Sequence, residues 1–323
     1  MLGLLNLNKP ADWTSRDAVN RVQRLLPRKT KVGHAGTLDP LATGVLIVCV
    51  GPTTRLVPWI HEHSKSYRAT FRLGVRSETD DIQGTLQEVP IPESATLDKL
   101  QALLPRFTGE IQQVPPAYSA VKVQGRRAYA VARSGKDVEL TARPVVVHRI
   151  DLVSCELPEF QLEIECGTGT YIRSIGRDLA KELGTAAVMT ELVRTRIGPW
   201  ELSAAMNLDD LSRENIAQHL RSPLELLNFL PQVSPAAEEL TRLIQGQTIA
   251  LPTGMTSDPA NPGRLSASAD EPLPTGEGTP QSFTPAGSTE SAPSWCVVDS
   301  DGKLIAIAEE RQGRLAPRIV LTR

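Results

Sequence analysis

The run Gly33 to Gly44, with the sequence GHAGTLDPLATG, restricts the fold of this chain more than any other segment. It holds one carboxylate, Asp39, and one histidine, His34, among small and turn-forming residues. Pro40 stiffens the backbone and disfavours the helical region for the aspartate before it. The continuous apolar run VLIVCV at Val45 to Val50 follows directly and predicts a buried strand. A carboxylate on a rigid loop beside a buried strand is typical of a reactive group; the alternative is that Asp39 only caps a turn.

Charge is distributed unevenly along the chain. Its 323 residues, 40% of them hydrophobic, can form one large domain and a small one. The net charge of −2 by itself argues against a nucleic-acid-binding protein. However, residues 1–60 hold eight Lys or Arg against three acids, and residues 122–149 hold seven against two. Such basic segments can bind phosphates even in a chain that is neutral overall.

The four cysteines predict neither disulfides nor a zinc site. They form no CxxC pair and have no histidine at metal-ligand spacing, and Cys49 and Cys166 lie in apolar, strand-like runs typical of a core. No signal peptide opens the sequence, and no apolar run approaches ~20 residues. We therefore expect a cytoplasmic protein that does not enter a membrane.

The apolar periodicity predicts an α+β fold. Helical spacing is found at residues 14–26, 96–107 and 171–183, and strand patterns at residues 67–73, 145–153 and 160–166. The acidic, proline-tailed residues 78–93 are expected to form a surface connection. Long strands mixed with helices, without a regular βαβ repeat, favour a mixed, mainly antiparallel central sheet with flanking helices.

A segment of low complexity interrupts the C-terminal part. Residues 252–294 are dominated by Pro, Gly, Ser and Thr and are predicted to be disordered, because they offer too little apolar surface to bury. Beyond them, Trp295–Val298 and Leu304–Ala308 predict a hairpin around the turn at Asp299–Gly302.

Five blocks, in order along the chain, resemble the bacterial TruB-type tRNA pseudouridine-55 synthases. The blocks are LNLNKPADWTS at 5–15, GHAGTLDPLATG at 33–44, SKSYRATFRLG at 64–74, VPPAYSAVKVQGRRAYAVAR at 114–133 and GTGTYIRSIGRDLAKELG at 167–184. The resemblance covers roughly residues 1–230 and, more loosely, residues 295–321. It implies a catalytic domain of the pseudouridine synthase fold at 1–232 with an RNA-clamping insertion at about 114–142. It also implies a small, β-rich, PUA-like domain at 233–323.

The resemblance implies isomerisation of uridine 55 in the tRNA T-arm to pseudouridine. This reaction breaks the C–N glycosidic bond, turns the uracil and rejoins it to the ribose through carbon, without cofactor or metal. Asp39 matches the family's invariant aspartate. The sequence leaves open whether Asp39 attacks C1′ or C6, or removes a ribose proton.

The other site residues are carried over from the family's motifs. The target uridine must leave its stack, and Tyr67 matches the tyrosine that packs on the flipped base, while His34 matches the histidine that fills the vacated space. Either residue could instead be structural. Tyr171 and Arg173 match a second active-site cluster, in which Arg173 would hold Asp39 ionised through a bidentate pair. Arg173 could equally be a surface residue of the first helical turn.

Further contacts also follow from the resemblance. Leu192 matches an apolar wall against the base, although such a leucine is ordinarily core. Lys9 matches an N-terminal motif that supports the catalytic loop, and a contact from it to the RNA backbone is predicted as well.

The RNA-clamping insertion supplies the remaining predicted contacts to RNA. Its arginines, around Gly125 and Tyr129, are expected to hold the phosphates of the tRNA arm; they are Arg126, Arg127 and Arg133.

Two alternatives compete with a stand-alone enzyme. One is a catalytic subunit that works with a guide RNA and partner proteins; the other is an RNA chaperone that only folds the arm. The stand-alone reading is favoured because LNLNKP begins at residue 5 and the C-terminal domain is short. The set of Asp39, Tyr67 and Arg173 favours an enzyme over a chaperone. We therefore expect a monomer whose partner is tRNA, with no obligate protein partner.

Overall fold

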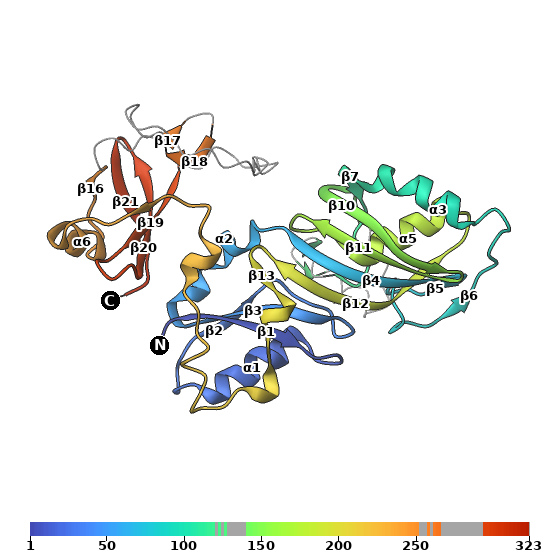
Figure 1. The fold of residues 1–323 in the computed structure, drawn as a ribbon, viewed down its shortest axis with the longest axis horizontal. Helices are drawn as coiled ribbons and strands as arrows, with labels where there is room; N and C mark the ends of the chain where they lie inside the picture. Colours follow the sequence, from blue (N-terminus) through green and yellow to red (C-terminus); the bar gives the residue numbers. More distant parts are fainter. Residues whose placement is uncertain are drawn as a thin grey trace.

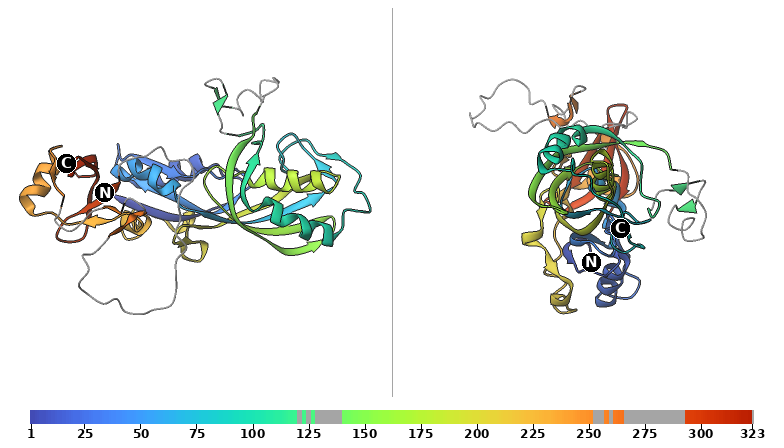
Figure 2. Two further views of the ribbon diagram at one scale, coloured as in Figure 1. Left: turned by 90° about the horizontal axis from the view of Figure 1, so that it is seen from above. Right: turned by 90° about the vertical axis from the view of Figure 1, so that its right-hand side faces the viewer.

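The computed structural model describes residues 1–119, 122–123, 126–127, 140–251, 257–258, 261–265 and 293–322. The molecule is elongated, with a small C-terminal sheet at one end and the long strands β10 and β11 toward the other (Figures 1 and 2). Both termini lie at the end that carries the small sheet (Figure 1). In the described part of the chain, no helix is both long enough and apolar enough to cross a membrane.

A ten-stranded sheet forms the body of the molecule. Its strand order is β14-β1-β3-β12-β4-β11-β10-β7, with β2 paired to β3 and β13 paired to β12. The strands are β1 (Gly3–Lys9), β2 (Val32–Ala35), β3 (Thr43–Val50), β4 (Lys65–Leu73), β7 (Gly109–Gln113), β10 (Arg143–Glu156), β11 (Glu159–Cys166), β12 (Ala187–Ile197), β13 (Trp200–Glu201) and β14 (Met206–Asn207). Only the β1–β14 and β3–β12 pairings are parallel, so the predicted mixed, mainly antiparallel sheet is confirmed.

The two halves of this sheet meet at a short junction between β3 and β12. Thr43 pairs with Val193 and Gly44 with Arg194, whereas β4 pairs with both of its neighbours along its whole length. Gly44 has a φ of 98°, and a Cβ there would lie 2.3 Å from the Arg194 carbonyl oxygen. Only glycine allows the two backbones to approach this closely.

The strand β3 is apolar on both faces because both are covered. Leu46 and Val48 pack in the cluster that contains α1 (Ser15–Leu25), while Ile47 and Cys49 pack in the cluster that contains Trp59 of α2 (Val57–His61). A continuous apolar run, rather than an alternating one, is the expected pattern for such a strand.

Helices cover one face of the other half of the sheet. α3 (Leu97–Leu103) and α5 (Ile172–Glu182) pack on Phe71, Leu162 and other residues of the largest core cluster. α5 lies so close to β4 that a Cβ at Gly176 would lie 2.1 Å from the Phe71 ring. The predicted helices and strands of this region are thus present, and Thr14 caps α1 through a capping box with Asp17.

The second sheet contains the predicted hairpin. Its strand order is β15-β19-β20-β21-β16, and α6 (Ala237–Ile244) packs beside it. The strands are β15 (Gln232–Val233), β16 (Ile249–Ala250), β19 (Ser294–Val298), β20 (Leu304–Arg311) and β21 (Arg314–Val320). Cys296 and Ile307 of this sheet share a buried cluster with Trp59 and Leu226. The second sheet therefore packs directly against the body of the protein.

One sequence-based prediction needs correction. Residues 78–93 are not simply a surface connection, because Asp81 is only 3% exposed.

The predicted disorder of residues 252–294 stays a prediction. Within this segment, β17 (Ser257–Asp258) pairs with β18 (Asn261–Leu265), and Ser294 begins β19. The rest of that segment lies outside the described residues, apart from Pro293.

Candidate active site

The loop that carries Asp39 connects β2 to β3, directly before the sheet junction. His34 does not belong to the loop as the sequence suggested. It lies in β2, opposite Val48 of β3, because residues 32–35 form a strand. The chain leaves β2 at Gly36, whose φ of 101° is in the left-handed region that favours glycine.

Two segments from the N-terminal block hold this loop on both sides of Asp39. The Ser15 hydroxyl donates to the Leu38 carbonyl at 3.1 Å and accepts from the Leu38 amide at 2.8 Å. The Lys9 ammonium donates to the Pro40 carbonyl at 3.2 Å. The block LNLNKPADWTS thus fixes the backbone immediately before and after the carboxylate.

The predicted contact between Lys9 and the RNA backbone is wrong in this structure. Lys9 is 0% exposed, and its ammonium also donates to the carbonyls of Pro10 at 2.8 Å and Trp13 at 2.6 Å. Burial lowers the pKa of Lys9 to about 8, and the nearby Asp39 carboxylate opposes that shift. Lys9 is a buried support of the loop, as the other reading of the N-terminal motif predicted.

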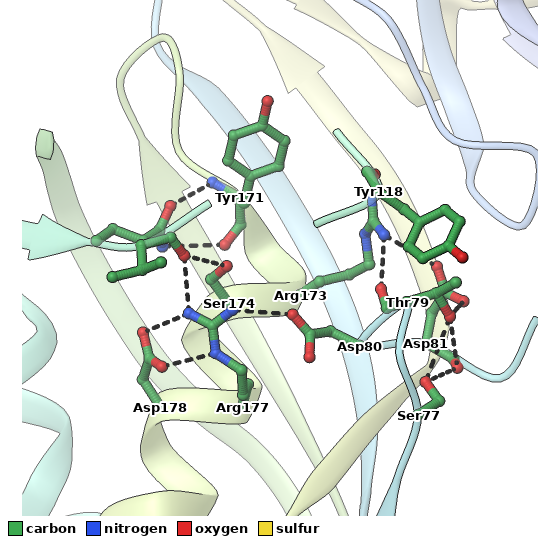
Figure 3. A network of polar contacts seen from close by, with 12 residues as sticks. Ser77, Thr79, Asp80, Asp81, Tyr118, Tyr171, Arg173, Ser174, Arg177 and Asp178 are labelled. Carbon is green, nitrogen blue, oxygen red and sulfur yellow. Dashed lines mark hydrogen bonds and ion pairs between the residues drawn. The ribbon is translucent and has the colours of Figure 1, made fainter. Parts of the chain in front are cut away.

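Arg173 brings α5 to the catalytic loop. It is 5% exposed, and its Nη2 lies 2.9 Å from Asp39 Oδ2, while its Nη1 lies 3.4 Å from Asp81 Oδ2. Nη1 also donates to the Thr79 carbonyl at 2.6 Å, and Nη2 to the Tyr118 carbonyl at 3.1 Å (Figure 3). The predicted bidentate pair is therefore wrong, because the guanidinium divides its two arms between two carboxylates.

Asp81 is the partner that the sequence did not reveal. Its Oδ1 accepts from the Thr79 hydroxyl at 2.6 Å and from the Gln83 amide at 3.0 Å, which leaves Oδ2 for Arg173. The run SETDDIQG contains several acids, and nothing in its spacing shows which of them turns inward. Asp81 is distinguished from the other acids only by its contact with Arg173 of α5.

The surroundings of Asp39 work against its ionisation. Its side chain is 35% exposed, yet protein atoms surround the carboxyl group closely. This burial raises the pKa of Asp39 above its usual value, Arg173 lowers it in part, and the negative charge of Asp81 adds to the rise. Arg173 is thus what keeps the charged form accessible, in the direction that the sequence predicted.

A second arginine on α5 holds the neighbouring segments. Arg177 contacts Asp80 at 2.9 Å and Asp178 at 2.8 Å, and it donates to the Val114 carbonyl at 2.8 Å (Figure 3). Ser174 donates to the same carbonyl at 3.0 Å. The same face of α5 therefore anchors both the segment around Asp81 and the start of the insertion that follows residue 114.

Tyr67 and Leu192 lie together with the loop in the largest apolar cluster. Tyr67 of β4 is partly buried, Leu192 of β12 is 7% exposed, and Leu38 belongs to the same cluster. Burial raises the pKa of Tyr67, and the positive charge of Arg194 opposes part of that rise. Arg194 is 1% exposed and is a further residue that sequence reasoning missed, because the run TELVRTRIG, with a glutamate, two threonines and two arginines, does not distinguish it from a surface arginine.

The remaining predicted residues are less closely joined to Asp39. Gln113 holds the Tyr171 backbone through hydrogen bonds of 2.8 and 3.1 Å, and the Tyr171 ring lies 5.1 Å from the Arg143 guanidinium carbon. Among the described residues, no hydrogen bond or ion pair joins the Tyr171 side chain to Asp39. The His34 ring is largely buried, which lowers its pKa, and its Nδ1 has no hydrogen-bond partner in the described part of the chain.

Within the insertion, the structure describes residues 114–119, 122–123, 126–127 and 140–142. β8 (Lys122–Val123) pairs with β9 (Arg126–Arg127). The side chains of Arg126 and Arg127, and all of Arg133, lie outside the described residues. Within the described ranges, no three His, Cys, Asp or Glu side chains gather to form a metal site.

Comparison with known proteins places this arrangement in a family. Residues 23–172 match the model of the family described as TruB family pseudouridylate synthase (N terminal domain). The tRNA pseudouridine synthase B of Gloeothece citriformis (strain PCC 7424) is 45% identical over 256 residues, which cover 78% of this chain and 82% of that protein. The tRNA pseudouridine synthase B of Arthrobacter sp. (strain FB24) is 41% identical over 325 residues, covering 98% and 96%.

A solved structure shows the same fold at low sequence identity. The crystal structure of a Cbf5-Nop10-Gar1 complex matches with a TM-score of 0.66 at 23% identity, covering 99% of this chain and 85% of that one. The predicted pseudouridine synthase fold, with an additional C-terminal β-rich sheet, is thereby confirmed.

Proposed function

The chain belongs to the TruB family of pseudouridine synthases, and from this we propose that it converts uridine 55 in the T-arm of tRNA to pseudouridine without a guide RNA or a partner protein. The enzyme class, an isomerase that forms pseudouridine in tRNA, follows from relatives that share 40–45% of its residues. The position on the tRNA, the roles of individual residues and the independence from partners are our proposal.

The contact between Arg173 and Asp39 is the observation that carries this proposal. A carboxylate on a loop held at Leu38 and Pro40, with a buried guanidinium 2.9 Å from its Oδ2, is a fixed, orientable reactive group. Breaking and re-forming a glycosidic bond requires one such group, as nucleophile or as base. Because burial raises its pKa, the Asp39 carboxylate, once ionised, is more basic than a solvated aspartate.

Around Asp39 we assign three roles to the apolar and aromatic side chains. Tyr67 would pack on the flipped uracil, with Leu192 forming the wall behind it. His34 would occupy the space that the base leaves in the RNA. Its Nδ1, which has no hydrogen-bond partner among the described residues, supports this assignment, because a nucleotide could supply the missing hydrogen bond. Tyr171, near the start of α5, would contact the substrate beside Arg173.

RNA binding is assigned to the insertion, and the chain is divided into two domains. Arg126, Arg127 and Arg133 would contact the phosphates of the T-arm. We assign residues 1–232 to the catalytic domain and residues 233–323 to the small domain. The buried cluster shared by Trp59 and Cys296 supports a fixed arrangement of the two.

Activity of the purified protein alone tests the proposal. An unmodified tRNA transcript, with no added RNA or protein, should gain one pseudouridine, mapped to position 55 by chemical labelling and primer extension. A transcript with cytidine at position 55 is the matched control and should gain none. Modification only after addition of cell extract would show a dependence on partners, and modification elsewhere would refute the position. Binding and refolding of tRNA without any modification would identify a chaperone.

A further inference from the structure

Arg194 lies at the point where the two halves of the main sheet join. Its backbone in β12 pairs with Gly44 of β3, and its side chain crosses the same junction. Nε donates to the Val45 carbonyl at 2.7 Å, and Nη2 donates to the Gly36 carbonyl at 3.0 Å. One guanidinium therefore connects β12 to the first residue of the loop that carries Asp39 and to β3, the strand that follows the loop.

The same side chain reaches Tyr67 on the other side. Arg194 and Tyr67 are direct neighbours across the β12–β4 pairing, and the positive charge of the guanidinium opposes the rise that burial causes in the pKa of Tyr67. Since guanidinium is only a donor, a hydrogen bond between the two groups has the hydroxyl oxygen as its acceptor and leaves the hydroxyl proton available to another acceptor.

Arg194 is 1% exposed, yet it has no acidic partner in the part of the chain that the structure describes. Arg173 contacts two carboxylates and Arg196 contacts Glu165 at 2.7 Å, but no acid of the described residues lies within ion-pair distance of Arg194. Burying a charge without an opposite charge is costly, and a packed apolar residue could join two strands without that cost. The neighbouring charges of Lys9 and Lys65 add repulsion. The charge at this position therefore calls for a reason other than sheet stability.

We propose that Arg194 is a positioning residue for the isomerisation, which holds the Tyr67 hydroxyl and the Asp39 loop in one hydrogen-bonded unit across the sheet junction. The inference rests on the proposed function, because it concerns the two residues assigned to the reacting uridine. A fork of several N–H donors is needed to reach two carbonyls and a hydroxyl together. Lysine offers one compact ammonium and cannot reproduce this geometry.

The test compares Arg194→Lys with Arg196→Lys. Arg196 is on the same strand, two residues away, and its side chain is 32% exposed and pairs with Glu165 instead of the catalytic loop. The single-turnover rate at saturating tRNA should fall about 10- to 100-fold in Arg194→Lys, with tRNA affinity within about threefold of wild type. Arg196→Lys should be close to wild type in both. A rate near wild type for Arg194→Lys, or a loss that appears only in affinity, would overturn the proposal.

A double-mutant cycle with Tyr67→Phe separates positioning from general destabilisation. If Arg194 acts through the hydroxyl, the double variant should lose clearly less than the product of the two single losses. Multiplicative losses would show that the two side chains act independently and would refute the link. If thermal melts show that Arg194→Lys does not fold, the single-turnover rate of Tyr67→Phe is the deciding measurement. A rate equal to that of wild type in Tyr67→Phe would refute the proposal. Asp39→Asn in the same assay reports on the proposed function itself, so that the failure of one idea is distinguishable from that of the other.

Discussion

Replacing Asp81 by Asn should slow the reaction while making Asp39 easier to ionise. The change keeps the size of the side chain and the Oδ1 that accepts from Thr79 and Gln83, but removes the charge that lies 3.4 Å from Arg173 Nη1. A hydrogen bond to a charged group contributes about 1.5–3 kcal/mol to stability. Arg173 keeps its contact with Asp39, so we expect a loss at or below that range and not the larger cost of an isolated buried charge.

Without this anchor, Arg173 still contacts Asp39 but holds the carboxylate less firmly in its reactive orientation, so the lost interaction energy is added to the activation barrier. About 1.4 kcal/mol corresponds to a factor of ten, so the single-turnover rate should fall by about 10-fold and by at most roughly 150-fold. The pH dependence should move in the opposite sense. The negative charge of Asp81 raises the pKa of Asp39, and its removal should shift the acid limb of the rate profile to lower pH.

The measurements are single-turnover rates between about pH 5 and pH 8 together with a thermal melt. Asp178→Asn is the matched control, because Asp178 pairs with Arg177 at a partly exposed position of α5, where an ion pair contributes little. An unchanged rate in Asp81→Asn would refute the role of Asp81 in orienting Arg173. An acid limb that moves to higher pH would refute the electrostatic argument.

Three further changes test other parts of the account. Arg173→Lys should recover little of the activity lost in Arg173→Ala, because a single ammonium cannot contact both carboxylates and both carbonyls; single-turnover rates near wild type would contradict this. Lys9→Met should lower the melting temperature and the rate, since three carbonyls lose their hydrogen-bond donor. The salt dependence of tRNA binding should stay unchanged, and a flatter slope of log affinity against log salt would instead support a contact between Lys9 and the RNA backbone. Replacing Arg126, Arg127 and Arg133 together by Ala should flatten the slope of log affinity against log salt by roughly 0.7–0.9 per lost phosphate contact, with little effect on the saturating rate. A control that moves these charges elsewhere and still binds like wild type would exclude a clamp.

Much of the fold follows from local patterns in the sequence. Apolar runs and caps are short-range signals, and they predicted the α1 helix, the strands β4 and β11, and the C-terminal hairpin. The buried strand after the catalytic loop was predictable because its apolar run is continuous. The family resemblance supplied Asp39 and Arg173, and the structure brings these two together.

What the sequence could not provide are contacts that depend on how distant elements pack. Asp81 resembles any surface acid until α5 places Arg173 above it. Lys9 resembles a phosphate ligand until three carbonyls enclose its ammonium. Arg194 lies 158 residues from the Gly36 carbonyl that it contacts. In each case the charged side chain is predictable but its partner is not, because charge carries no periodic signal comparable to that of apolar residues.

The central claim is that one ionised carboxylate, Asp39, performs the chemistry while other residues hold the tRNA. Its most direct test is the single-turnover conversion of an unmodified tRNA transcript by Asp39→Asn, alongside binding of the same transcript. We predict no detectable pseudouridine, affinity within a few-fold of wild type, and a melting temperature no lower than wild type. The last result is expected because burial raises the pKa of Asp39 above its value in the unfolded chain. The folded protein therefore loses stability as the pH rises from the unfolded pKa through the folded one, whereas the asparagine of the variant does not ionise and causes no such loss. Measurable turnover by carefully purified Asp39→Asn would contradict the account.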